Sequence, residues 1–219
     1  MDLTVNYSIS TIVILLRFMM DYFGNLSDRT NKNIHHILDI KIYIAKLILF
    51  YMTIINNIKF DNNFVLNNEG NKEISQVLIY NNFDYGINMI LYIYQKDYES
   101  MYHHFVSIAI ITGCEIYNYH NATITVMFLF LLSSPFLSVA KVCRALKYNK
   151  ISEIAFITFG LVFFTCRIVI YTYMLYYTIF NKYYDRYEYY LINSFQILLY
   201  KMQIDWMKKI INVIVDNKK

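Results

Sequence analysis

The sequence predicts an all-α membrane protein, a polytopic bundle of six to seven helices. Of its 219 residues, 57% are hydrophobic and only 16% are charged. Proline occurs once and glycine five times, so the residues that favour turns are scarce. A membrane-spanning helix needs roughly 20 mostly apolar residues, and the uncharged run at residues 121–140 meets that need alone.

Seven helices are expected, over residues 3–23, 36–58, 75–95, 103–119, 121–146, 153–180 and 190–215. The first lacks the basic start and the cleavage site of a signal peptide, so we expect it to be retained. An Asn-Asn-Glu-Gly-Asn run within residues 59–74 marks a solvated loop before the third helix. The fourth segment is short, so we expect it to be either a full membrane span or a re-entrant helix that enters the membrane only partway.

The distribution of lysine and arginine predicts the orientation. Seven spans would place nine of them on one side, at positions 29, 32, 96, 147, 150, 208, 209, 218 and 219, against four at positions 59, 72, 182 and 186. The positive-inside rule then gives a lumenal N-terminus and a cytosolic C-terminus.

We divide the chain into an N-terminal helix and loop (1–27), a transmembrane domain (28–215) and a short cytosolic tail (216–219).

The remaining composition argues against two classes of site. The three cysteines, Cys114, Cys143 and Cys166, fit neither a zinc-ligand spacing nor a disulfide framework, so we expect no metal site. The net charge of +4 is spread along the chain without a dense basic block. We therefore expect no nucleic-acid partner.

Two adjacent histidines, His103 and His104, precede an apolar stretch at residues 105–113. Imidazole is costly in hydrocarbon unless it faces a protein interior, a cavity or a partner. It is also the side chain best suited to proton transfer near neutral pH. The alternative is a polar cap on the helix at the level of the lipid headgroups.

Five of the expected helices carry a stripe of polar residues, which suggests helices arranged around a shared polar interior. The residues are Asp39 and Lys46; Asn81, Asp84 and Asn88; His104, Ser107 and Glu115; Arg167; and Gln196, Tyr200 and Gln203. The alternative for each stripe is snorkelling or structural hydrogen bonding. Pro135, after Ser133 and Ser134, predicts a kink that either shapes a cavity or is a simple packing bend.

These features together resemble the TLC-domain family of membrane proteins, which includes the ceramide synthases, over about residues 28–211. The matching segments are Asp28-Arg29 with His35, Tyr102-His103-His104, Ser133-Ser134-Pro135-Phe136, Val162-Phe163-Phe164 with Arg167-Ile168, and Met202-Gln203-Ile204-Asp205-Trp206. The segment from Ser133 to Phe136 resembles the corresponding segment of family members that are not ceramide synthases. The resemblance implies a barrel of six helices around a central, lipid-facing cavity, preceded by one N-terminal helix.

Ceramide synthases transfer a fatty acyl group from acyl-CoA to a sphingoid-base amine. Carried over, the resemblance implies that His103 or His104 acts as base or acyl-accepting nucleophile. Arg167 or Lys141 would stabilise an oxyanion or hold CoA phosphates, and Arg144 is a further candidate for the phosphates. The synthases carry aspartates near positions 131–135, where this chain has none, and Asp84 is our candidate to replace them.

The expected function is therefore a role in lipid homeostasis, with acyl transfer to a lipid amine or hydroxyl as its chemistry. The alternatives are a non-enzymatic lipid-binding protein, cargo receptor or scaffold, and a small transporter. The transporter is the least favoured of these, because the sequence shows no inverted repeat. We expect no tightly bound cofactor, membrane lipid and acyl-CoA as partners, and residence in the endoplasmic reticulum. A homodimer is left open.

Overall fold

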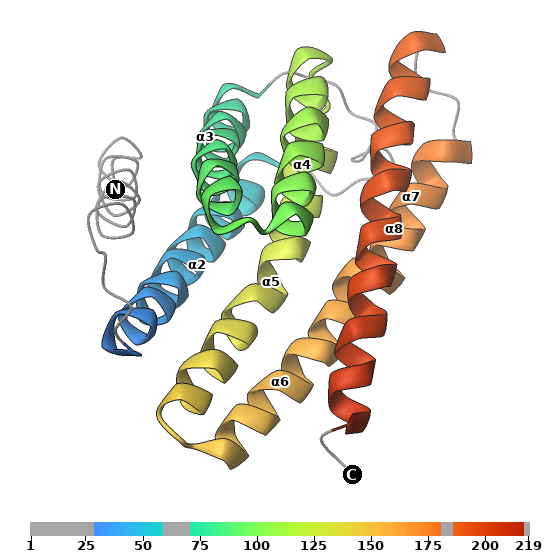
Figure 1. The fold of residues 1–219 in the computed structure, drawn as a ribbon. Helices are drawn as coiled ribbons and strands as arrows, with labels where there is room; N and C mark the ends of the chain where they lie inside the picture. The colour runs from blue at the N-terminus through green and yellow to red at the C-terminus, as the bar shows by residue number, and fades with distance from the viewer. Residues whose placement is uncertain (1–28, 59–70, 181–185, 217–219) are drawn as a thin grey trace.

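The computed structural model describes residues 29–58, 71–180 and 186–216, and these form a bundle of helices without a strand (Figure 1). The elements are α2 (Arg29–Asn57), α3 (Lys72–Gln95), α4 (Tyr98–Ile116), α5 (His120–Ala145), α6 (Asn149–Phe163), the π-helical segment η1 (Phe164–Ile170), α7 (Tyr171–Phe180) and α8 (Arg186–Asp216). Since α6, η1 and α7 follow one another directly, the described chain forms six rods. The all-α prediction is confirmed, and the first expected helix, residues 3–23, lies outside the described residues.

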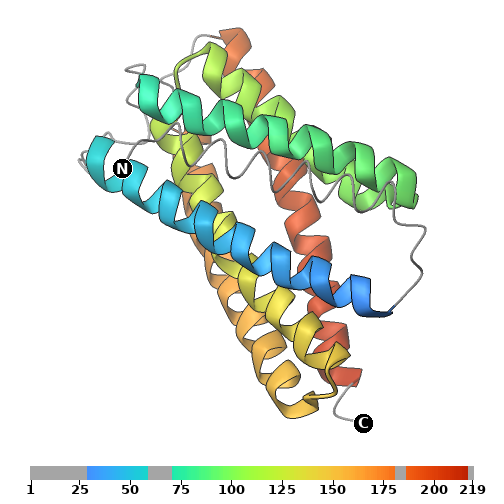
Figure 2. The same ribbon diagram turned by 90° about the vertical axis from the view of Figure 1, so that its left-hand side faces the viewer.

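The helices pack as neighbouring hairpins. α5 packs against α6 on one side and α2 on the other, α3 pairs with α4, and α4 contacts α8. Seen from the side, the axes of α2 and α3 are nearly parallel and their chain directions opposite, with α5, α6 and α8 behind them (Figure 2). The turn between α3 and α4 lies partway along the bundle, so α8 and the α5–α6 hairpin extend beyond it (Figure 1).

Capping side chains set the boundaries around the histidine pair. Asn71 is the N-cap of α3, and its side chain accepts from the backbone N–H groups of Glu73 and Ile74. Lys96 ends α3 in the left-handed conformation, with a φ of 58°. The next residue, Asp97, is the N-cap of α4, and its side chain accepts from the backbone N–H of Ser100. The fourth helix therefore begins at Tyr98, earlier than the predicted position 103. Its histidines lie inside the helix and do not cap it.

Two irregular segments face each other in the middle of the bundle. Pro135 lies within α5, where it removes a backbone N–H donor, a change that commonly bends a helix. The adjoining rod carries the π-helical segment η1, with Arg167 at its centre. Single π-helical turns are rare and are found frequently at functional sites.

The outer surface is strongly apolar. Among the described residues, three helical segments are long and apolar enough to cross a membrane, namely Ile40–Asn57, His120–Ala145 and Asn149–Phe180. Large side chains such as Ile154, Leu161 and Tyr173 are about two-thirds exposed, at 66%, 65% and 68%. Exposed apolar side chains of this size match a lipid environment better than water.

Two glycines give a matched stability test of the packing. A Cβ at Gly160 would lie 3.2 Å from Ile210 Cγ2 and 3.4 Å from Ile214 Cδ1, whereas a Cβ at Gly86 would meet nothing within 4 Å. We expect Gly160→Leu to lower the free energy of unfolding by about 1–3 kcal/mol, because it forces α6 away from α8. Gly86→Leu, the matched control, should be neutral or stabilising, by up to about 1 kcal/mol, because leucine favours helix over glycine and a Cβ there meets nothing within 4 Å. Thermal unfolding in detergent measures both, and equal losses would contradict the close α6–α8 packing.

Candidate functional site

The two histidine rings meet edge-on, with their centroids 5.5 Å apart, but their other neighbours differ. His103 is buried, and its ring packs on Trp206 of α8 with the centroids 4.6 Å apart. His104 packs between Tyr85 and Tyr92 of α3, at centroid distances of 4.6 and 5.1 Å. The division follows from helical geometry, because consecutive residues differ by about 100° around the axis.

On the His103 side, Arg167 is the dominant charge. Its guanidinium donates from Nη2 to the Phe130 carbonyl at 2.5 Å, from Nη1 to Gln203 Oε1 at 3.3 Å, and from Nη2 to Ser134 Oγ at 3.4 Å. The Phe130 and Phe163 rings lie 5.0 and 4.9 Å from the guanidinium carbon, within reach for cation–π contact. Arg167 also interacts electrostatically with His103.

This cluster retains unused hydrogen-bonding groups. Arg167 Nε, Gln203 Nε2 and His103 Nδ1 are buried and have no hydrogen-bond partner within the described part of the chain. Buried polar groups are normally paired, so these three groups are free to bond a further polar atom. The arginine and the glutamine offer N–H donors, which suit the oxygen atoms of a carbonyl or carboxylate.

A cavity of about 40 Å³ lies beside the cluster, between α4, α5, α7 and α8. The end of the cavity nearest the cluster is lined by Ser107, Phe130, Tyr171 and Leu199. One helical turn further along the same four rods lie His103, Ser134, Arg167 and Gln203. The polar cluster therefore closes one end of the cavity.

The walls and length of the cavity define what fits it. Aliphatic and aromatic side chains such as Ile110, Met127 and Met174 form most of the wall. The lining runs from Ser107 to Cys114 on α4, which is about 10 Å along the helix axis. Since a water needs about 10–15 Å³ on this scale, the space corresponds to about three waters or a short stretch of hydrocarbon.

On the His104 side, the structure changes the expected role of Asp84. Its carboxylate forms a buried ion pair with Lys46 Nζ, which also donates to Asn81 Oδ1 at 3.4 Å. His104 interacts electrostatically with both charges of the pair. Asp84 is thus close to the histidine pair but is engaged by Lys46, and among the described residues no carboxylate bonds to His103.

Other residues that the sequence singled out lie elsewhere. Lys141 and Arg144 are exposed on the last two turns of α5, and Lys141 is about 10 Å along the axis from Ser134. The structure does not bring them to the histidine pair. Ser107 was expected to share a face with His104, but it lines the cavity on the His103 face. The side chain of Asp39 lies outside the described residues.

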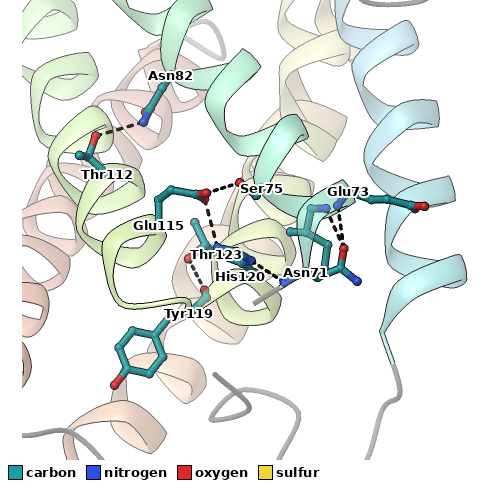
Figure 3. Close-up of polar contacts among 10 residues, drawn as sticks. Asn71, Glu73, Ser75, Asn82, Thr112, Glu115, Tyr119, His120 and Thr123 are labelled. Atoms are coloured by element: carbon teal, nitrogen blue, oxygen red, sulfur yellow. Dashed lines mark hydrogen bonds and ion pairs between the residues drawn. The ribbon is translucent and has the colours of Figure 1, made fainter. Parts of the chain in front are cut away.

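A second polar cluster, which the sequence reasoning missed, joins the start of α3 to the α4–α5 corner (Figure 3). His120 Nδ1 accepts the backbone N–H of Asn71 at 2.9 Å, so its proton resides on Nε2, 3.2 Å from Glu115 Oε2. The other oxygen of Glu115 accepts from Ser75 Oγ. The only sequence signal was the Tyr119-His120-Asn121 turn, in which His120 turns out to begin α5.

A third contact missed from the sequence covers His103 from outside. Glu99, one turn before His103, accepts from Trp206 Nε1 at 2.5 Å and from Lys209 Nζ at 2.6 Å. The indole of Trp206 therefore bridges Glu99 and the His103 ring. Glu99 and Trp206 are 107 residues apart, so no local pattern could reveal the contact.

Residues 3–212 match the family model for the TLC domain, which covers nearly the whole chain. The same chain matched no curated protein and no solved structure.

The Lys46–Asp84 pair generates a stability prediction. Asp84→Asn should lower the free energy of unfolding by about 3–5 kcal/mol, because it leaves the Lys46 ammonium buried without a counter-charge. The double variant Lys46→Met with Asp84→Leu should recover most of that loss, since no buried charge remains. Thermal unfolding in detergent compares the two. A double variant no more stable than Asp84→Asn would show that the pair has another role.

Proposed function

The chain belongs to the TLC-domain family, and from this premise we propose that it acts in lipid homeostasis by holding a short stretch of one hydrocarbon chain of a lipid in the cavity between α4, α5, α7 and α8. The polar end of that lipid would lie at His103, Arg167 and Gln203. The protein is an integral membrane protein of the TLC type. We further propose residence in the endoplasmic reticulum with a lumenal N-terminus and a cytosolic C-terminus.

One observation carries the proposal, namely that an apolar cavity ends one helical turn from a buried polar cluster with unpaired groups. An amphiphile satisfies both parts, because its chain fills the apolar space and its oxygens accept from Arg167 Nε and Gln203 Nε2. An ion or a small polar solute would not explain why most of the cavity wall is apolar. A purely apolar ligand would leave the buried donors unpaired.

The chemistry that this arrangement supports best is acyl transfer through His103. A neutral imidazole nitrogen would attack the thioester carbonyl of acyl-CoA, so that a C–N bond forms and the C–S bond breaks, and CoA leaves as the thiol after taking up the imidazole proton. A lipid amine or hydroxyl would then attack the acyl-imidazole, giving the amide or ester and returning its proton to His103. Arg167 and Gln203 would stabilise the oxyanion in both steps.

The outer contacts fit this reaction in two respects. Lys141 and Arg144 remain candidates for the CoA phosphates, because both are exposed while the thioester would lie deeper in the protein. Glu99 and Lys209 form an exposed ion pair, and such pairs contribute little stability. The contact that holds Trp206 over His103 can therefore open at low cost.

A specific observation favours the second candidate, a non-enzymatic lipid-binding protein that serves as cargo receptor or scaffold. Asp84, the acid expected to orient a catalytic histidine, is engaged by Lys46. Without an orienting acid, a histidine base is weaker. In this case the cavity and the Arg167 cluster would bind lipid without turning it over.

A matched pair of histidine variants tests the proposal. With purified protein, acyl-CoA and a lipid acceptor, His103→Ala should reduce acyl transfer by at least about 100-fold, because it removes the reacting imidazole. His104→Ala is the control and should retain most of the transfer, since His104 faces Tyr85 and Tyr92.

Mass spectrometry of the products measures transfer, and a photoactivatable fatty acid measures chain binding in the same variants. Transfer that survives in His103→Ala would exclude the catalytic role. Chain labelling without transfer in the unaltered protein would favour the receptor or scaffold. A label found only outside the cavity would exclude the lipid-binding site itself.

A further inference from the structure

The indole of Trp206, which covers His103, is held from α4 by one carboxylate. Glu99 Oε1 accepts from the indole Nε1–H at 2.5 Å, and the indole packs on the His103 ring with the centroids 4.6 Å apart. We propose that Glu99 is a positioning residue, which holds Trp206 so that water is kept from an acylated His103. The inference rests on the proposed function, because it assumes that His103 carries the acyl group.

One face of α8 carries the relevant contacts in order of increasing exposure. Gln203, Trp206 and Lys209 follow one another at intervals of three residues, which places them on one face of the helix. Gln203 is fully buried and bonds Arg167, Trp206 is half-buried, and the Lys209 side chain is 61% exposed. A rotation of the indole alone would therefore remove the cover from His103 and leave the bond between Gln203 and Arg167 intact.

Two kinds of contact hold the indole of Trp206. Its rings pack against an apolar cluster on α6 and α8, and such packing does not fix the direction of the N–H. Glu99 supplies the direction from α4, and its two oxygens also accept from Lys209 Nζ at 2.6 and 2.5 Å. Glu99 lies in the first turn of α4, where the helix dipole favours a negative charge. The carboxylate thus draws the indole N–H towards α4, over His103.

An acylated His103 can react with two acceptors. A lipid amine or hydroxyl gives the amide or ester. Water would instead form a C–O bond to the acyl carbon and break the C–N bond, which releases the free fatty acid and returns one proton to the imidazole. Closing a site over a reactive intermediate prevents this hydrolysis. The exposed Glu99–Lys209 ion pair can open at low cost to admit the thioester and then close again over the acyl group.

The first measurement tests the contact itself. Trp206 is the only tryptophan in the chain, so the fluorescence of the full-length protein in detergent reports on it alone. We expect Glu99→Ala to increase quenching by acrylamide about threefold, the effect of losing one hydrogen bond partly exposed to water. Glu99→Gln keeps an acceptor for the indole N–H and should retain most of the protection. Lys208→Met is the matched control and should change nothing, because Lys208 pairs with Asp205 on the same helix.

The second measurement tests the exclusion of water. The same variants receive acyl-CoA and a lipid acceptor, and mass spectrometry gives the ratio of free fatty acid to acylated lipid, with His103→Ala as the background. Glu99→Ala should raise this ratio about threefold, Glu99→Gln should raise it less, and Lys208→Met should leave it unchanged. A loss of structure would lower both products together, so the ratio reports on positioning.

The possible results separate the inference from the proposed function. Equal quenching in Glu99→Ala and in the unaltered protein would overturn the positioning of Trp206. Increased quenching with an unchanged product ratio would overturn the exclusion of water and leave acyl transfer intact. If the unaltered protein forms neither product, the proposed acyl transfer fails and the exclusion of water fails with it.

Discussion

The burial of the Arg167 guanidinium among apolar helices is the constraint on which the centre of this protein depends. A charge removed from water must be paired or fully hydrogen-bonded, and no described carboxylate bonds to this one. The protein compensates with a backbone carbonyl, a glutamine, a serine and two aromatic rings. These groups come from α5, α6 and α8, so the arginine on η1 also fixes how the helices approach one another.

The need to bond Arg167 accounts for two irregular segments, the proline in α5 and the π-helical segment η1. Pro135 adjoins the segment of α5 that presents the Phe130 carbonyl and Ser134 to the guanidinium. The π-helical turn places Arg167 so that it points between α5 and α8. Gln203 then completes the set from α8. The cavity begins one turn away, where most of the side chains that line it are apolar. A polar cluster beside a mostly apolar space suits an amphiphilic lipid.

The sequence predicted the helices well, because uncharged runs in a lipid-soluble chain have few alternative structures. It placed the start of the fourth helix too late, since the capping action of Asp97 depends on the tight turn after Lys96. The inward position of Arg167 was predictable, because mid-span arginine is costly at a lipid-facing position. Its partners on α5 and α8 were not, because they lie more than 30 residues away along the chain. The separate surroundings of His103 and His104 likewise require knowledge of which helices flank α4.

The account is tested most directly by an experimental structure of the protein in lipid nanodiscs at a resolution that shows bound chains. We expect elongated density between α4, α5, α7 and α8, with its polar end within hydrogen-bonding distance of Arg167 and His103. A centre filled by protein side chains, with ordered lipid only on the outer surface, would contradict the account.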